Sequence, residues 1–306
     1  METRFWRQIA LIGATASGKS SLAFKLAKRY DGLILSLDSL SVYRHIDIAS
    51  AKPPKEELVA IPHYGIDIQE PDEPFDATRF IRLYQEASLN ALEQKKPLFI
   101  VGGSGFYLKM LLEGISPLPE ISPEIRRKTK TLLTDLPDAH RYLQSEAPRF
   151  ADTIAASDRY RIEKGLLILL QTGKDPLDYF SDNPPRSPVR EALPLFEIEW
   201  PKELLRERIV QRTDAMLHQG LLDEVSMLEH RYGRAPHAMK AIGISEVLDY
   251  FDGRIDFNRM REKIITDTAR LAKRQQTFNR SQFSEVTRGT KEFIEEAVEK
   301  YLHRNL

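Results

Sequence analysis

The segment that most constrains the fold is a glycine-rich stretch near the amino terminus, Gly13-Ala14-Thr15-Ala16-Ser17-Gly18-Lys19-Ser20. It matches the pattern G-x-x-x-x-G-K-[ST] and lies between the apolar run 8–12 and a helical stripe of apolar residues within 20–30. In that context, backbone N–H groups converge on phosphate oxygens at the start of the helix. We predict that this loop binds a diphosphate group, with Lys19 as a mobile positive charge and the Ser20 hydroxyl reaching a bound Mg²⁺.

Two further apolar runs indicate the fold class. The run 33–37 ends at Asp38, and the run 97–101 leads into Gly102-Gly103-Ser104-Gly105, with a helical pattern at 80–95 between them. Strands that alternate with helices are typical of a doubly wound α/β domain. We therefore predict an α/β, P-loop NTPase-like parallel sheet flanked by helices, in which ligands bind beyond the carboxyl ends of the strands.

The character of the chain changes after Gly114. Residues 116–195 hold several prolines, many charges and helical patterns such as 160–171, which predicts a mostly helical insertion domain. The run 195–200 can return the chain to the sheet as a further strand, and 202–306 is expected to be mostly helical. The predicted domains are thus a catalytic core, 1–115 and 196–306, and the insertion 116–195.

Composition excludes several classes of protein. The 45 basic and 45 acidic residues balance, which argues against nucleic-acid binding by the whole surface but permits a local basic face. There is no Cys, hence no disulfide and no thiolate metal site. No apolar run approaches the roughly 18 residues that a membrane span needs. We expect a cytoplasmic protein that does not span a membrane.

Polar residues at the strand ends are candidates for chemistry. Asp38 could hold Mg²⁺, cap the next helix or accept a proton from a substrate, and its place beside a phosphate-binding loop favours the catalytic role. Ser104 offers a hydroxyl in the same cleft, although a glycine turn that enters a helix explains this sequence equally well. Lys52, in Ala51-Lys52-Pro53, follows soon after Asp38 and could be merely solvated, the usual fate of a lone lysine.

Basic residues gather in three places, which are 158–161, 206–212 and 259–280. In the last, Arg270, Lys273 and Arg274 share a helix face at i, i+3 and i+4. A solvated helix face would explain any one of these clusters. The three together, with Tyr160 and Phe278 interleaved, favour a cleft that binds a polyanion.

Taken in order, these segments resemble the tRNA dimethylallyltransferase (tRNA isopentenyltransferase) family in its bacterial form. The resemblance covers about residues 8–280 and rests on the loop 13–20, Asp38-Ser39-Leu40-Ser41-Val42-Tyr43-Arg44, 51–53, 102–107, 158–162, 216–225, 241–243 and 267–275. The blocks 38–44 and 267–275 are far more specific to the family than the loop 13–20. The eukaryotic zinc finger is absent.

The resemblance implies transfer of a dimethylallyl group from its diphosphate to N6 of adenine 37, beside the anticodon of tRNAs that read codons starting with U. It implies Mg²⁺ at Ser20, and a monomer that binds the anticodon stem-loop through the insertion. Asp38, Ser104 and Arg208 are the implied catalytic residues, and Arg212 is a second candidate for contact with the diphosphate. The implied tRNA-binding residues are Asp38, Ser39, Leu40, Ser41, Ser104, Arg127, Tyr160, Arg161, Ile162, Glu163, Lys164, Lys273 and Arg274.

This sequence departs from the family pattern in several places, and the block Gln276-Thr277-Phe278-Asn279-Arg280 lacks the tryptophan often found there. Ala14 replaces a common proline, Ser104 replaces a threonine and keeps its hydroxyl, and Ser41 replaces a glutamine that reads the adenine edge. Two other functions remain open from the residues. A small-molecule P-loop kinase fits the first 110 residues nearly as well, but it leaves the basic helices and the block 158–162 unexplained. A P-loop RNA-binding or switch protein would use Asp38 only to organise Mg²⁺.

Overall fold

The structure is a computed structural model that describes residues 7–190 and 192–303. The outermost residues of the predicted core, 1–6 and 304–306, lie outside this range. The chain divides into two compact units. The core unit comprises Met1–Leu111 and Pro188–Leu306, and the insertion unit comprises Leu112–Ser187. Each is described by itself.

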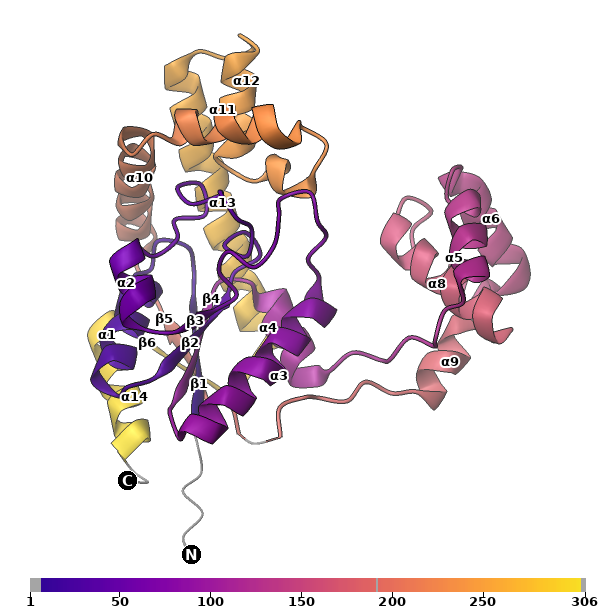
Figure 1. Cartoon of the computed structure of the whole chain (residues 1–306), viewed down its shortest axis with the longest axis horizontal. Helices are drawn as coiled ribbons and strands as arrows, with labels where there is room; N and C mark the ends of the chain where they lie inside the picture. The colour runs from indigo at the N-terminus through magenta and orange to yellow at the C-terminus, as the bar shows by residue number, and fades with distance from the viewer. Residues whose placement is uncertain (1–6, 191, 304–306) are drawn as a thin grey trace, which may run out of the picture. The chain divides into compact units, whose positions relative to one another are not determined.

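The core unit is built on one parallel sheet of six strands, in the order β3-β2-β4-β1-β5-β6 (Figure 1). The predicted fold class is confirmed. Two strands were not predicted, because β3 has only two residues and β6, Val286-Thr287-Arg288-Gly289, is not an apolar run. The strands are β1 (Gln8–Gly13), β2 (Leu33–Leu37), β3 (His63–Tyr64), β4 (Leu98–Gly102), β5 (Leu195–Ile198) and β6 (Val286–Gly289).

Strand β4 brings the three polar strand ends together. It pairs with β1 on one side and β2 on the other, and Gly102 lies opposite both Ile12 and Leu37. The backbones approach so closely that a Cβ on Gly102 would lie 1.9 Å from the Leu37 carbonyl oxygen. The segments that follow β1, β2 and β4 therefore start from neighbouring positions on one edge of the sheet.

Helices cover both faces of this sheet (Figure 1). On one face, Leu22 and Leu26 of α1 and Ile294 and Val298 of α14 share a buried cluster with strand residues. On the other face lies α3, which begins at Asp76, whose carboxylate caps the helix by accepting the Arg79 N–H. The helices of this part of the core unit are α1 (Lys19–Arg29), α2 (Lys55–Ala60), α3 (Ala77–Gln94), α4 (Gly105–Glu113) and α14 (Lys291–His303).

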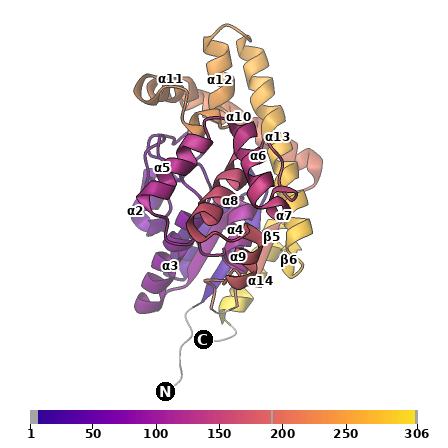
Figure 2. The ribbon, with the colours of Figure 1, turned by 90° about the vertical axis from the view of Figure 1, so that its right-hand side faces the viewer.

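A further helical layer lies beyond the carboxyl ends of the strands (Figure 2). Its longest member, α13, packs against α10 and α12 and also reaches β1. Val42 and Ile46 from the segment after β2 share an apolar cluster with Val225, Met260 and other residues of this layer. Its elements are α10 (Lys202–His218), α11 (Leu221–Tyr232), the 3₁₀ helix η1 (His237–Lys240), α12 (Ile244–Phe251) and α13 (Phe257–Gln282).

The insertion unit is helical and has its own core. Leu143, Phe150, Ile162 and Leu166 are among its buried residues. Asp158 caps α8 by accepting the Arg161 N–H. The helices are α5 (Pro123–Leu132), α6 (Leu136–Glu146), α7 (Pro148–Ala151), α8 (Arg159–Thr172) and α9 (Pro176–Asp182). Within residues 7–190 and 192–303, no helix combines the length and apolarity that crossing a membrane requires.

A buried carboxylate ties three elements of the core unit together. Glu197 of β5 is only 2% exposed. Its Oε1 accepts from Asn279 Nδ2 of α13 at 2.7 Å, and its Oε2 accepts from Arg288 Nε of β6 at 2.9 Å. Because a buried charge is stable only when it is paired and hydrogen-bonded, this contact fixes β6 and the end of α13 against the sheet.

We expect Glu197→Gln to lower the free energy of unfolding of the core unit by about 2–4 kcal/mol, because Arg288 loses its buried counter-charge. The matched control is Glu199→Gln, which removes a more exposed pair, Glu199 Oε1 to Arg280 at 3.0 Å. That change should cost less than about 1 kcal/mol. Urea unfolding of both variants gives the comparison, and equal losses would contradict the assignment.

Candidate active site

A cleft of about 810 Å³ lies in the core unit and is lined by the segments that follow β1, β2 and β4, together with α13 and parts of α10 and η1. Ligands in open α/β sheets bind at this edge, and the volume is in the range of small-molecule sites. Among the predicted site residues, the cleft is lined by Thr15, Lys19, Ser20, Asp38, Ser39, Leu40, Ser41, Ser104, Arg212 and Arg274.

The glycine-rich loop adopts a tight conformation between β1 and α1. Gly13 and Gly18 have φ of +147° and +87°, and Ala16 has φ of +63°. Glycine adopts such values without the steric penalty that other residues incur. Gly18 is the amino-terminal cap of α1, so the backbone N–H groups that begin the helix are available to an anion.

Three side chains from other elements hold the backbone of this loop. Gln275 Oε1 of α13 accepts the Thr15 N–H at 2.8 Å, and Gln275 Nε2 donates to Gly103 O at 3.1 Å. Arg208 Nε donates to Ala16 O at 2.7 Å, and Trp200 Nε1 donates to Ser17 O at 2.8 Å. Sequence reasoning missed the roles of Gln275 and Trp200. Gln275 could have been found, because it is the last residue of the family-specific block 267–275. Nothing in the sequence singled out Trp200.

Lys19 lies where three charges meet. Its Nζ donates to Ala14 O at 3.1 Å. Burial lowers the pKa of Lys19 to about 8, an effect that the Asp38 carboxylate opposes and Arg212 increases. Burial also lowers the pKa of Arg212, again opposed by Asp38. An anion bound here would stabilise the charged form of both side chains.

Asp38 follows β2 and has a defined orientation. Its Oδ1 accepts the Leu40 N–H at 2.8 Å and the Ser41 N–H at 3.3 Å, so the carboxylate caps the turn that it begins. Both of these bonds end on Oδ1, which leaves Oδ2 for a ligand in the cleft. Capping and chemistry are therefore compatible in this residue.

Ser104 lies beside the start of the Asp38 turn. The Ser104 N–H donates to Leu37 O at 3.1 Å, which fixes the residue next to the end of β2. Its carbonyl accepts the Tyr107 N–H at the start of α4, so the glycine turn also serves to begin a helix. Ser104 lines the same cleft as Asp38.

Ser41 has a structural role that the sequence did not reveal. It is 4% exposed, and its Oγ lies 2.8 Å from Ser36 Oγ and donates to Gly65 O at 3.5 Å. A glutamine at this position would have to extend past these partners. The shorter serine instead joins β2 to the turn after β3.

The two candidate arginines of α10 lie in different surroundings. Arg212 lines the cleft. Arg208 is outside the lining; its guanidinium stacks on the Trp200 ring at 4.7 Å and holds the loop backbone. Lys273 and Arg274 of α13 are both exposed, and Arg274 lines the cleft.

The remaining predicted residues belong to the insertion unit. Arg127, Tyr160 and Arg161 are exposed, and Lys164 Nζ lies 5.3 Å from the centroid of the Tyr160 ring. Arg161 NH1 is 3.4 Å from Asp158 Oδ2. Ile162 is fully buried in the core of this unit, so its side chain packs rather than faces a ligand. Glu163 is partly buried.

The oxygen donors of the cleft suit a hard cation only if a ligand contributes. Within residues 7–190 and 192–303, no group of three or more His, Cys, Asp or Glu side chains could hold a metal ion. Mg²⁺ is commonly bound by one or two protein oxygens together with substrate phosphates and water. The Ser20 hydroxyl and the Asp38 carboxylate, which both line the cleft, fit that mode.

Comparison with known proteins identifies the family. The family model "IPP transferase" matches residues 41–282. The tRNA dimethylallyltransferase of Sulfurovum sp. (strain NBC37-1) is 52% identical over 95% of this chain and 97% of its own length. That of Nautilia profundicola is 50% identical over 94% and 98%. The solved tRNA isopentenylpyrophosphate transferase of Bacillus halodurans matches with a TM-score of 0.71 and 27% identity, covering 98% of this chain and 97% of that one. The resemblance seen in the motifs is confirmed: the chain belongs to the IPP transferase family, prenyl-transferring enzymes whose bacterial members are named tRNA dimethylallyltransferases.

Proposed function

We propose that this chain transfers a dimethylallyl group from dimethylallyl diphosphate to N6 of adenine 37 in tRNAs that read codons starting with U. One observation carries the proposal. A phosphate-binding loop and a carboxylate, Asp38, line a single cleft that the basic helix α13 borders. A small-molecule kinase would need the first two features alone, whereas an RNA substrate also accounts for Arg274 at the cleft.

The bond-forming step needs a base. The N6 lone pair attacks C1 of the dimethylallyl group, and the C1–O bond breaks with its electron pair leaving on the diphosphate oxygen. The amine then loses a proton, which Asp38 Oδ2 accepts. Oδ1 stays bound to the Leu40 and Ser41 N–H groups, which keeps the carboxylate oriented toward the cleft.

The leaving diphosphate gains negative charge as the C1–O bond breaks. N–H groups at the start of α1, Lys19 and Arg212 surround the place where that charge develops. Fixed donors of this kind contribute most in a water-excluded site. Arg208 contributes by holding Ala16 O, and Ser104, which lines the same cleft as Asp38, would orient the amine.

Magnesium belongs to this proposal as the divalent cation. The Ser20 hydroxyl would hold it together with the diphosphate oxygens. When bound, it supplies positive charge that stabilises the leaving diphosphate.

The tRNA has to present adenine 37 unstacked, because a stacked base cannot reach the cleft. Arg274, with Lys273 beside it on α13, is suited to the RNA backbone near the cleft. The exposed Arg127, Tyr160 and Arg161 of the insertion unit, with the partly buried Lys164, are suited to the anticodon stem-loop, with Tyr160 as a stacking platform. Every residue in the proposal comes from one copy of the chain, acting as a monomer in the cytoplasm.

The purified protein, given dimethylallyl diphosphate, Mg²⁺ and an unmodified tRNA with A36 and A37, should form N6-isopentenyladenosine, detected by mass spectrometry of the digested tRNA. The same tRNA with G37 is the control and should remain unmodified. If the A37 tRNA gains no isopentenyl group while ATP is hydrolysed or a phosphate is transferred, the kinase alternative replaces this proposal.

Asp38→Asn keeps an oxygen to cap the Leu40 and Ser41 N–H groups but removes the base. We expect kcat to fall about 10²–10⁴-fold, while the Kd for tRNA changes less than about tenfold, or 1.4 kcal/mol. Asp256→Asn, at the cap of α13, is the matched control and should leave both quantities near the wild-type values. A Kd that rises with the loss of kcat would make Asp38 a recognition residue instead.

Affinity for dimethylallyl diphosphate should depend on pH through Lys19. The bound diphosphate requires the ammonium form, and the free enzyme loses that proton as the pH rises through about 8. Binding should therefore be strongest below that pH and weaken by up to about tenfold per unit above it, with proton uptake. Calorimetric titrations from about pH 7 to about pH 9.5 measure this. Lys19→Met should bind weakly throughout, and a flat wild-type profile would contradict the assignment.

A further inference from the structure

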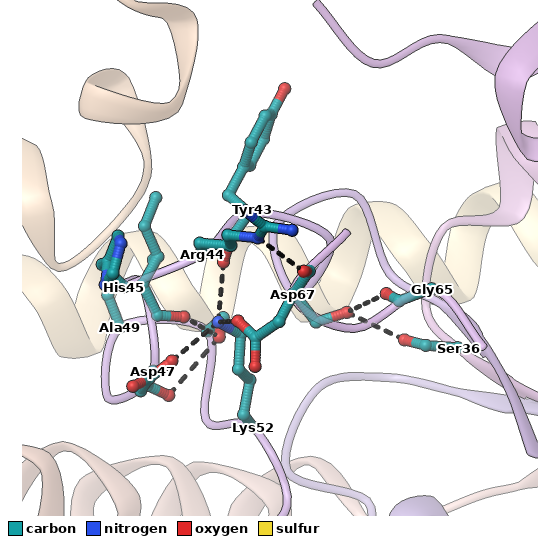
Figure 3. Close-up of polar contacts among 12 residues, drawn as sticks. Ser36, Tyr43, Arg44, His45, Asp47, Ala49, Lys52, Gly65 and Asp67 are labelled. Atoms are coloured by element: carbon teal, nitrogen blue, oxygen red, sulfur yellow. Dashed lines mark hydrogen bonds and ion pairs between the residues drawn. The ribbon is translucent and has the colours of Figure 1, made fainter. Parts of the chain in front are cut away.

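Lys52 is buried and fully hydrogen-bonded, contrary to the solvated lysine expected from its sequence context. Its side chain is 3% exposed. The ammonium donates to Tyr43 O at 2.6 Å, Asp47 Oδ1 at 2.7 Å and Asp67 Oδ1 at 2.6 Å (Figure 3). A lysine ammonium has three N–H groups, so these acceptors use them all. Lys52 therefore has no donor left for a substrate phosphate, although it borders the cleft.

Tyr43 and Asp47 belong to a folded segment, residues 38–53, that leaves β2 and forms one wall of the cleft, whereas Asp67 follows β3. Residues 41–44 run beside 67–69, with Asp67 N–H donating to Ser41 O at 3.2 Å and Arg44 N–H donating to Gln69 O at 2.8 Å. Lys52 joins this pair to the returning part of the segment, residues 49–53. Figure 3 shows Lys52 reaching Tyr43 and Asp67 from that returning part.

The backbone of this segment is held in conformations that it would not keep by itself. His45 and Ala51 in this segment have φ of +65° and +50°, and Asp67 beside it has φ of +56°. Non-glycine residues in this region are unfavourable and persist only where surrounding contacts hold them. A second anchor supports the same segment, because the Glu224 carboxylate of α11 accepts the N–H groups of Asp47, Ile48 and Ala49 at 2.7–2.9 Å.

A short path of bonds connects Lys52 to the base. The Lys52 ammonium binds the Asp67 carboxylate, the Asp67 N–H binds Ser41 O, and the Ser41 N–H binds Asp38 Oδ1. We propose that Lys52 is a positioning residue that fixes this cleft wall, so that the Asp38 carboxylate lies at a constant place relative to the acceptor amine. The inference rests on the proposed transfer reaction.

The test compares Lys52→Met, which has similar length and no charge, with Lys52→Arg and a matched control. Lys96→Met is the control because it removes another lysine–carboxylate pair, Lys96 to Asp31 at 2.9 Å, at the amino ends of the strands. Three quantities are measured at a temperature where all variants are folded: kcat and KM for transfer, the Kd for inorganic pyrophosphate, and hydrogen exchange of the amides in 39–53.

Lys52→Met should lower kcat about 10–100-fold, because small displacements of a reacting group are costly. The Kd for pyrophosphate should change less than about twofold, since the glycine-rich loop is held by other residues. Exchange in 39–53 should accelerate. Lys52→Arg should recover part of kcat because it restores a charged donor for both carboxylates, and Lys96→Met should match the wild type in all three measurements.

A wild-type kcat in Lys52→Met would overturn the inference, and so would unchanged exchange in 39–53 or an equal loss of pyrophosphate affinity. If Lys52 only stabilised the fold, Lys52→Met would have a lower melting temperature, but its folded fraction would keep the wild-type kcat. Failure of the transfer reaction itself is separate, because it would appear in the wild type. If the wild type shows no transfer, hydrogen exchange in 39–53 still tests whether Lys52 holds the cleft wall, because it compares Lys52→Met with the wild type without using activity.

Discussion

The arrangement of the site depends on the pairing of β4 with β1 and β2. Parallel pairing in this register puts the ends of three strands at the same height, with Gly102 between Ile12 and Leu37. A side chain at Gly102 would collide with the Leu37 carbonyl, so the close approach requires glycine. The glycine-rich loop, the Asp38 turn and the Ser104 turn are neighbours for this reason, and the chemistry proposed for them needs that proximity.

Much of this architecture could be predicted from short stretches of sequence. Runs of apolar residues ended by glycine or aspartate predicted β1, β2 and β4 to within one residue at each boundary, and the pattern 13–20 predicted the loop between β1 and α1. These features were readable because burial of a parallel strand and the geometry of a phosphate loop each impose a pattern on consecutive residues. Strand β3 has only two residues, and β6 is partly exposed and polar, so neither imposes such a pattern.

Long-range contacts could not be predicted in the same way. Lys52 read as solvated because its partners Asp47 and Asp67 lie on both sides of α2, and only the folded segment brings them together. Trp200 and Gln275 meet the glycine-rich loop from positions far along the chain. Arg208 and Arg212 share a helix and a spacing, yet one supports the loop and the other borders the cleft. Such roles follow from tertiary packing, which spacing alone does not encode.

The loop proposed to bind the diphosphate has several of its polar groups held by other parts of the core unit. The Lys19 ammonium binds Ala14 O, the Thr15 N–H binds Gln275, and the Ala16 and Ser17 carbonyls have donors from α10 and from Trp200. A ligand therefore enters a rigid receptor and orders few additional dihedral angles as it binds. Most of the conformational entropy of this loop is lost during folding. Binding of a diphosphate would therefore not bear that cost again, and its association would not wait for the loop to become ordered.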